Sequence, residues 1–359
     1  MPKILTIVGA RPQFVKAAAL SRALKKFNLE EVLVHTGQHF DENMADIFFR
    51  QMEIPEPKYN LGINSLSHGA MTGRMLEEIE KVLLAEKPDA VVVFGDTNST
   101  LAGALAASKL HIPVAHVEAG LRSFNMKMPE EINRILTDRI SSWLFCPTET
   151  AVKNLHREGF ENFNAKIENI GDVMYDVALF YSKISAKQVT VLTTLKKDSR
   201  HVVLTTLHRQ ENTDDLQRLS SIVEALNDLN KEFRVVLPLH PRTKKILERE
   251  SIRLDFEALE PLGYFDMIEL LKNCTFVITD SGGLQKEAFF FKKQCLIIRD
   301  ETEGTELVEL GYNHLVGAEK QRILKKAGEI KASNPAFLEK PYGEGNAAEK
   351  IALFLKEEL

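Results

Sequence analysis

The chain has 359 residues, a formal net charge of −5 and a hydrophobic content of 44%. That length exceeds the needs of one small core and is typical of two α/β domains. Because the net charge is negative, the protein as a whole does not attract nucleic acid or an anionic membrane electrostatically. An anionic ligand therefore requires local Arg or Lys side chains or helix ends.

The cysteines and the first residues exclude further classes of protein. Cys146, Cys274 and Cys295 lie in or beside apolar runs without the spacing of a disulfide framework or a zinc site, so we interpret them as reduced core residues. The apolar stretch after Lys3 is too short for a signal peptide, and no apolar run approaches the roughly 18–20 residues of a membrane span. We therefore expect a cytoplasmic protein that contacts neither membrane nor nucleic acid.

The first half of the chain alternates β-rich runs with amphipathic helical stretches. We expect strands at residues 3–8, 31–35, 90–94 and 113–117, and helices at 12–26, about 41–51, 68–86 and 98–110. The run at 90–94 is apolar throughout, as expected of a parallel strand that is covered on both faces.

The second half repeats this alternation. Strands are expected near residues 201–206, 234–238, 275–279 and 294–298, and helices near 173–184, 214–228, 264–272, 282–290 and 346–359. Alternating strands and helices of this kind predict doubly wound parallel sheets. The predicted fold class is α/β, with two Rossmann-like domains that face a cleft.

A turn-rich stretch with Gly159 and Gly171 separates the halves, and we place the hinge near residues 167–175. The predicted domains are residues 1–168 and 169–342. The amphipathic helix within residues 343–359 can pack back on either domain, with the N-terminal one as the candidate.

Charged residues of the first half follow strands, where open parallel sheets collect ligands. Arg11 and Lys16 come after the first strand, and because cations are disfavoured at a helix N-terminus, a bound anion explains them better than a surface role. Asp96 and Glu118 follow the third and fourth strands, and Glu130 opens a helix. Three carboxylates in one cleft suit acid/base chemistry, although Glu130 alone is equally typical of a first helical turn.

Asp96 and Glu118 each have a structural alternative. Asp96 is a common type of helix cap, but Asn98 and Ser99 are available for that task. Glu118 is a poor strand residue and costly to bury without a partner, so its place at a strand end indicates function.

The second half also carries polar residues at its strand ends. His208 and Arg209 follow the strand at 201–206 and predict a phosphate or proton-transfer site, and His240 occupies the equivalent end of the next strand. A hydroxyl and two glycines then open a helix whose unpaired backbone N–H groups suit a phosphate, at Ser281, Gly282 and Gly283.

Several cofactor motifs do not occur. The chain has no HExxH or clustered ligand spacing, no GxGxxG after the first strand and no GxxxxGK[ST]. We therefore expect no metal site, no tightly held nicotinamide and no ATPase activity.

Seven segments together resemble the non-hydrolysing UDP-N-acetylglucosamine 2-epimerases over essentially the full chain. They are GARPQFVKAAAL at 9–20, TGQH at 36–39, FGDTNSTLAGALAA at 94–107, HVEAGLRS at 116–123, MPEEINRILTD at 128–138, TLHRQEN at 206–212 and TDSGGLQKEAFF at 279–290. The resemblance implies a two-domain, glycosyltransferase-B-like architecture. It also implies a homodimer that inverts C2 of a UDP-activated N-acetylamino sugar for surface polysaccharide synthesis, without a cofactor.

The resemblance implies roles for individual residues. Asp96, Glu118 and Glu130 match the acid/base carboxylates, and His208 closes on the pyrophosphate or assists proton transfer. Glu287 binds the ribose hydroxyls. The phosphate and nucleotide contacts match Arg11, Lys16, Ser281, Gly282 and Gly283.

Departures from the family pattern bear on the substrate. Many members have Glu where Gln13 stands and Arg where Gly304 stands, and Asp41 replaces a Gln that accompanies activation by substrate. The stretches at 120–138 and 285–291 are most similar to the branch that acts on UDP-2,3-diacetamido-glucuronic acid, so that substrate is the alternative.

The rival from another class is a glycosyltransferase, which needs an acceptor groove rather than converging carboxylates. A hydrolysing epimerase is a second rival.

Overall fold

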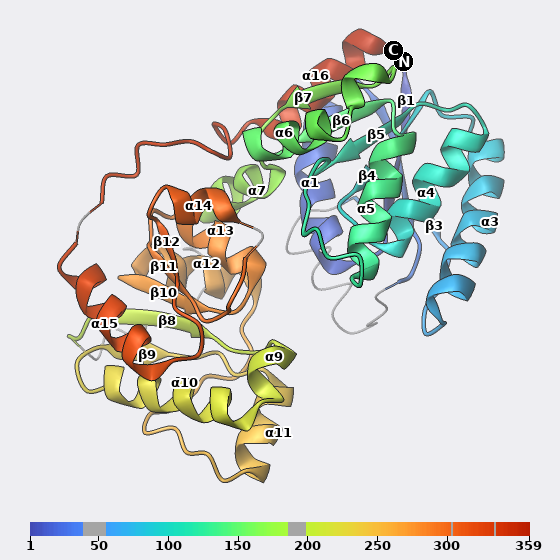
Figure 1. Ribbon diagram of the computed structural model, residues 1–359. Helices are drawn as coiled ribbons and strands as arrows, with labels where there is room; N and C mark the ends of the chain where they lie inside the picture. Colours follow the sequence, from blue (N-terminus) through green and yellow to red (C-terminus); the bar gives the residue numbers. More distant parts are fainter. Residues whose placement is uncertain (39–54, 186–198, 303, 334) are drawn as a thin grey trace. The chain divides into compact units, whose positions relative to one another are not determined.

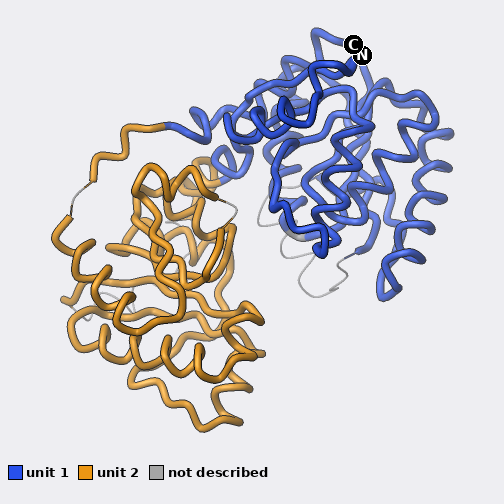
Figure 2. The backbone as a smooth tube through the Cα atoms, in the orientation of Figure 1, with its two compact units in different colours: residues 1–177, 340–359 blue, residues 178–339 orange. Residues whose placement is uncertain are grey.

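The computed structural model describes residues 1–38, 55–185, 199–302, 304–333 and 335–359. It divides into two compact units (Figure 2), unit 1 with residues 1–177 and 340–359 and unit 2 with residues 178–339. The C-terminal segment therefore belongs to the same unit as the N-terminal half. The predicted helix at about 41–51 and the position of Asp41 lie outside the described residues.

Unit 1 is built on a seven-stranded parallel sheet with the order β3-β2-β1-β4-β5-β6-β7. Its strands are β1 (Lys3–Val8), β2 (Glu30–His35), β3 (Tyr59–Asn60), β4 (Ala90–Phe94), β5 (Val114–Val117), β6 (Trp143–Cys146) and β7 (Lys166–Asn169). Its helices are α1 (Arg11–Lys26), α3 (His68–Glu86), α4 (Asn98–Lys109), α5 (Pro129–Ile140), α6 (Glu149–Arg157), the short η1 (Phe160–Asn162) and α16 (Ala347–Glu358). This order is the doubly wound one.

Helices cover both faces of this sheet because its strands are apolar on both. Leu5 and Ile7 of β1 pack with side chains of α3 and α4 in one buried cluster, and helices α3, α4 and α5 lie side by side (Figure 1). All five residues of β4 are fully buried, as the uninterrupted apolar run predicts.

The C-terminal helix α16 packs on unit 1 beside α1. The Phe354 ring contacts the rings of Trp143 and Phe145 on β6 edge-on, at centroid distances of 5.9 and 5.2 Å. Asp176 accepts hydrogen bonds from the backbone N–H groups of Ala347 and Ala348, so it caps the start of α16. Burial raises the pKa of Asp176 to about 6.

Unit 2 holds a five-stranded parallel sheet with the order β12-β11-β10-β8-β9. Its strands are β8 (Val202–Thr206), β9 (Arg234–Val236), β10 (Phe276–Thr279), β11 (Cys295–Ile297) and β12 (Asn313–Leu315). Its helices are α9 (Gln210–Thr213), α10 (Leu216–Leu229), α11 (Pro241–Arg249), α12 (Tyr264–Asn273), α13 (Gly282–Phe290), α14 (Thr305–Glu309) and α15 (Lys320–Lys331), while α7 (Val173–Ser182) passes from unit 1 into unit 2.

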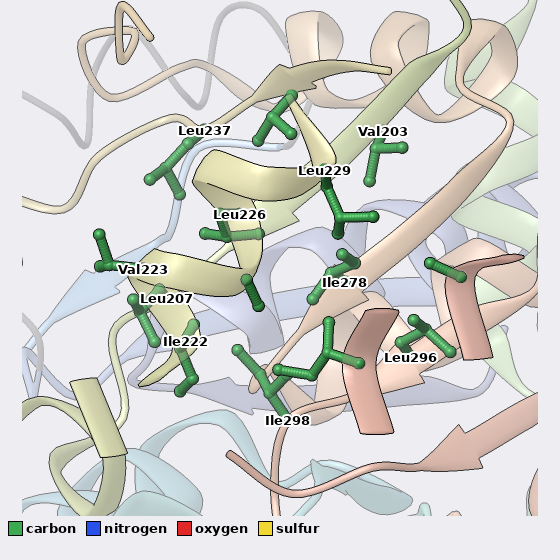
Figure 3. Close-up of a cluster of buried hydrophobic side chains, with 14 of the residues drawn as sticks. Val203, Leu207, Ile222, Val223, Leu226, Leu229, Leu237, Ile278, Leu296 and Ile298 are labelled. Atoms are coloured by element: carbon green, nitrogen blue, oxygen red, sulfur yellow. The ribbon is translucent and has the colours of Figure 1, made fainter. Parts of the chain in front are cut away.

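The unit 2 sheet is buried between two clusters of apolar side chains. One cluster, seen in Figure 3, joins Val203 and Ile278 of the sheet to Ile222, Leu226 and other residues of α10. The second lies against α12 and α13. Two parallel sheets covered in this way confirm the predicted α/β class.

Two smaller predictions can be judged here. Cys146, Cys274 and Cys295 are buried and free, as predicted. The cap of α4 is Thr97, whose hydroxyl accepts the Thr100 N–H at 3.2 Å, so the expected cap at position 98 or 99 is wrong while Asp96 remains available. Among the described residues, no helix combines the length and apolar character that crossing a membrane requires.

Candidate active site

A cavity of about 180 Å³ lies in unit 1 beyond the C-terminal ends of β1, β4 and β5. β1 and β4 are neighbours in the sheet, and successive strands are added outward from β1 on one side and from β4 on the other. This position is therefore the topological switch point, where sheets of this kind bind ligands. The lining combines two carboxylates with two cations. It consists of Ala10, Pro12, Gln13, Lys16, Phe94, Gly95, Asp96, Thr97, Glu118, Leu121 and Arg134.

Glu118 is held in an unusual backbone conformation at the end of β5. Its φ is +72°, in the left-handed region that a non-glycine residue adopts at an energetic cost. The Phe145 carbonyl accepts its backbone N–H at 3.1 Å. Its carboxylate pairs with the ammonium of Lys16, and both side chains are mostly buried. Lys16, predicted to attract an anionic ligand, therefore has a protein carboxylate as its partner in unit 1.

Asp96 is held by helix α5. The guanidinium of Arg134 binds the Asp96 carboxylate with one nitrogen and Glu131 with another, the latter at 2.6 Å. Burial alone would raise the pKa of Glu131, but the backbone N–H groups of Ser123 and Phe124 and the Arg134 charge outweigh burial and lower it. Glu131 is thus a fixed anion that orients Arg134 toward Asp96.

Gln13 joins two loops at the edge of the cavity. Its carbonyl accepts the N–H groups of Gly9 and Ala10, at 2.8 and 3.0 Å. Its amide nitrogen donates to the Phe94 carbonyl at 2.7 Å and to two hydroxyls of the following turn. An ionised Glu at this position has no donor for the Phe94 carbonyl. Gln13 therefore joins the two loops through a hydrogen bond that an ionised Glu at the same position cannot form.

The predicted carboxylates do not all lie together in unit 1. Asp96 and Glu118 line the cavity, whereas Glu130 is exposed on the first turn of α5 and is not part of the lining. The adjacent Glu131 points inward instead and is fully buried. The Arg11 side chain lies outside the described part of the structure.

In unit 2, a buried carboxylate organises the loop after β8. Asp280, at the end of β10, accepts the backbone N–H groups of His208 and Arg209, each at 3.0 Å. Its other oxygen lies 3.1 Å from Nδ1 of His208. Burial would raise the pKa of Asp280, but the His208 side chain and these N–H groups outweigh burial and lower it. A carboxylate partner places the proton of His208 on Nδ1, which leaves Nε2 for a ligand.

Most of the remaining predicted residues of unit 2 lie at helix starts. Ser281 caps α13 by accepting the Leu284 N–H, Gly282 and Gly283 form its first turn, and Glu287 lies further along the helix. Among the described residues, a Cβ on Gly283 would meet only the Ser281 hydroxyl, at 4.0 Å, which leaves space for a ligand at this N-terminus.

His240 and Arg209 occupy the N-cap positions of α11 and α9. Nδ1 of His240 accepts the Arg242 N–H at 3.2 Å, and the His240 ring lies 6.3 Å from that of His208. Arg209 is the exposed N-cap residue of α9. Asp280 thus brings the loop of His208 and Arg209 to the end of β10.

Sequence reasoning missed the partners of the predicted residues. Arg134, Glu131 and Asp280 were part of the quoted motifs but had no assigned role. One signal was available, because residues three apart on a helix are neighbours, as Glu131 and Arg134 are. Nothing in the sequence indicates that Arg134 reaches Asp96, which lies 38 positions away.

Two parallel-sheet units with polar side chains at their strand ends define a two-domain α/β protein of the glycosyltransferase-B-like class. The model of one family, UDP-N-acetylglucosamine 2-epimerase, matches residues 22–356. The chain is 55% identical to the UDP-2,3-diacetamido-2,3-dideoxy-D-glucuronate 2-epimerase of Pseudomonas aeruginosa, over 98% of this chain and 99% of that one.

Solved structures agree with this result. The Methanocaldococcus jannaschii UDP-GlcNAc 2-epimerase in complex with UDP-GlcNAc and UDP has a TM-score of 0.85 and 45% identity, covering 99% of both chains. The Neisseria meningitidis UDP-GlcNAc 2-epimerase bound to UDP-GlcNAc has a TM-score of 0.84 and 33% identity, covering 99% of this chain and 100% of that one. The chain belongs to the UDP-N-acetylglucosamine 2-epimerase family.

Proposed function

We propose that the protein inverts C2 of a UDP-2-acetamido sugar, with UDP-N-acetylglucosamine as the main candidate, by elimination and re-addition of UDP. The observation that carries this proposal is the unit 1 cavity, where Asp96 and Glu118 lie at adjacent strand ends, each with its own cation. Family membership supports the same reaction class.

The reaction places specific demands on the carboxylates. A C2 proton with no neighbouring carbonyl is weakly acidic, so its loss must accompany cleavage of the C1–O bond, with the bonding electrons leaving on UDP. One carboxylate takes the C2 proton, and a 2-acetamidoglucal forms. UDP then re-adds to C1 while a second acid delivers a proton to the other face of C2. We propose that Asp96 and Glu118, which line the cavity, take and deliver the proton, and that Glu130, exposed on the first turn of α5, assists from outside the lining.

The leaving group needs donors that meet the charge as it develops. We propose that the N-terminus of α13, with Ser281, Gly282 and Gly283, holds the pyrophosphate and that Glu287 binds the ribose. Nδ1 of His208 faces Asp280, and in the doubly protonated ring Nε2 also donates and supplies a further contact to the pyrophosphate. The remaining proposed contacts to the anionic leaving group come from Arg11, Lys16, Arg209 and His240.

A second candidate substrate is UDP-2,3-diacetamido-2,3-dideoxy-glucuronic acid. It is favoured by the 55% identity to the Pseudomonas aeruginosa enzyme that carries this name, over nearly the whole of both chains. The chemistry at C1 and C2 is the same for both sugars, so the same residues serve either.

The test is incubation of each UDP-sugar in deuterium oxide, followed by proton NMR. Formation of the C2 epimer with deuterium at C2 is expected for at least one substrate. Transfer of the sugar to an added acceptor would indicate a glycosyltransferase, and accumulation of free UDP and free sugar would indicate a hydrolysing epimerase. Absence of deuterium at C2 with both substrates would refute the proposal.

We further propose that the protein acts in the cytoplasm as a homodimer. Support for self-association comes from exposed apolar side chains on unit 1, since Ile132 and Leu136 lie one turn apart on α5 and are 40% and 46% exposed. Light scattering on the purified chain should give the mass of a dimer, and a monomer mass at micromolar concentration would refute this part.

A further inference from the structure

His116 of β5 is fully buried behind the unit 1 cavity and faces an acceptor with each ring nitrogen. Nδ1 lies 2.7 Å from a carboxylate oxygen of Asp138, and Nε2 lies 2.7 Å from the Gly95 carbonyl oxygen. A backbone carbonyl accepts only, so Nε2 must carry a proton. An ionised Asp138 likewise requires a proton on Nδ1, which makes the ring an imidazolium.

The other hydrogen-bond partners of Asp138 favour its carboxylate form. Its second oxygen accepts from the Arg122 guanidinium at 2.7 Å and from the Gly120 N–H at 3.2 Å. Protonating Asp138 would leave Arg122 facing an uncharged carboxyl in the interior, which is costly. Neutral His116 paired with protonated Asp138 is therefore the disfavoured arrangement.

Charge balance leads to the same state. Arg122 binds Glu158 with two parallel hydrogen bonds, of 2.7 and 2.8 Å, as well as Asp138. With His116 protonated, this group of two cations and two anions is neutral. With His116 neutral and Asp138 ionised, it carries a net negative charge in a region where Arg122 and Asp138 are almost completely buried.

The Nε2 bond fixes the turn that precedes Asp96. Gly95 has a φ of +62°, its N–H donates to the Val117 carbonyl at 2.9 Å, and its carbonyl accepts from His116. The side chain of Glu118, two residues beyond His116, lies so close that a Cβ on Gly95 would come within 3.2 Å of its Oε2. The same ring thus connects the loop of one cavity carboxylate with the strand of the other.

We propose that His116 is a permanently protonated positioning residue that clamps the Gly95 turn and thereby sets the distance between the Asp96 and Glu118 carboxylates. The functional half of this inference rests on the proposed epimerase activity. The other charged groups near the clamp are Lys16, which pairs with Glu118, and Arg134, which pairs with Asp96. Cys146 of β6 also interacts electrostatically with Asp138, and burial raises the pKa of this thiol further above its usual value.

The charge state can be measured without any substrate. In protein with ¹⁵N-labelled histidine, both ring nitrogens of His116 should show protonated-type shifts from pH 6 to pH 9, a range in which an ordinary histidine with a pKa of about 6.5 loses one proton. His116→Gln identifies the signal, and the signal of exposed His156 is recorded alongside it for comparison. A neutral-type nitrogen on His116 at pH 8 would overturn the proposal.

The positioning role is tested in His116→Gln with His156→Gln as the matched control. We expect kcat to fall by about 10–100-fold in His116→Gln with KM within about threefold, since a misplacement of about 1 Å can cost 10²-fold. Carbon-13 NMR of the Asp96 and Glu118 carboxyl groups should show altered titration in this variant only. A folded His116→Gln protein with wild-type kcat and wild-type carboxyl titration would overturn the role.

These measurements separate the two proposals. If the wild type epimerises neither UDP-sugar, the proposed function fails, while the ¹⁵N and carboxyl measurements still decide the clamp. If the His116→Gln protein does not fold, the ¹⁵N measurement on the wild type decides the charge. His116→Asn, which keeps a donor for Asp138 but cannot reach Gly95, then replaces it in the assignment of the ¹⁵N signal and in the kinetic and carboxyl tests.

Discussion

The two units hold their polar residues in different ways. In unit 1 the cavity carboxylates are bound by side-chain cations, Glu118 by Lys16 and Asp96 by Arg134. In unit 2 the buried Asp280 is bound largely by backbone N–H groups, those of His208 and Arg209. A side-chain ion pair can open when a substrate arrives, whereas backbone donors are fixed by the fold.

The two ways of holding a polar residue suit two different chemical tasks. A carboxylate that can leave its ion pair and contact the substrate is suited to proton transfer, because the transferred charge moves only a short distance. A loop and helix start fixed by backbone hydrogen bonds suit an anion that must be held while it leaves and returns. Variants in the two units should therefore separate turnover from UDP binding.

The largest effect is expected from a carboxylate of unit 1. Glu118→Gln should lower turnover by about 10³-fold, because the amide cannot take or give the proton, while UDP affinity stays within about threefold. Epimerisation is followed by NMR and UDP binding by calorimetry. The exposed Glu77→Gln serves as the control. Equal losses of turnover and UDP affinity in Glu118→Gln would remove the proposed division between the units.

The matching change in unit 2 is Asp280→Asn. It should weaken UDP binding and lower turnover together, by about 10²-fold, because charge-assisted hydrogen bonds to the loop of His208 and Arg209 are lost. Calorimetry with UDP and initial rates measure the two quantities. Turnover that falls while UDP affinity is unchanged would show that Asp280 acts only through the His208 ring.

A pH experiment distinguishes the units by stability. Burial lowers the pKa of His35, in unit 1, to about 4, and its Nε2 has no hydrogen-bond partner among the described residues. A folded-state pKa below the unfolded value of about 6.5 means that this stability is present above pH 6.5 and is lost as the pH falls toward 4. Relative to His35→Phe, the wild type should lose about 3 kcal/mol between pH 7 and pH 4.

Urea unfolding at each pH measures that difference. Asp280 of unit 2 has a pKa lowered from its usual 3.8, so its contribution is lost only at more acidic pH. Hydrogen exchange should therefore show His35-dependent weakening of β2 before any Asp280-dependent weakening of β10. Parallel pH profiles for the wild type and His35→Phe would contradict this prediction.

The smallest effect compares two helix caps. Ser281→Ala and Thr97→Ala each remove a hydroxyl that accepts a backbone N–H at a helix start, so each should cost about 1 kcal/mol of stability. Only Ser281→Ala should also weaken UDP binding, by a few-fold. Thermal unfolding and calorimetry test the pair, and equal UDP affinities in both variants would argue against a pyrophosphate site at α13.

Much of the fold follows from local patterns in the sequence. The strand at β4 and the helix α3 have the predicted bounds, and α13 begins and ends as expected. Continuous apolar runs define buried strands, and glycine or hydroxyl residues define helix starts, because both signals act over a few residues. The positions of Asp96 and Glu118 follow as well, since parallel strands end at one edge of their sheet.

Local sequence patterns do not determine which face of α5 points into the fold. Glu130 and Glu131 are identical in type and adjacent, yet successive residues point about 100° apart on a helix, so one is exposed and the other fully buried. Which one faces inward depends on how α5 packs on α4 and β5. The sequence selected Glu130 through family resemblance, whereas packing directs Glu131 to Arg134.

The two α/β halves, the placement of polar residues at strand ends and the family all follow from the order of residues along the chain. The partners of the site residues come from the packing of the fold: Lys16 for Glu118, Arg134 for Asp96 and the two acceptors of His116. The two kinds of information act over different distances. Hydrophobic periodicity and caps are local properties of the chain, whereas an ion pair forms between residues that only the packing of the sheet and its helices brings within hydrogen-bond distance.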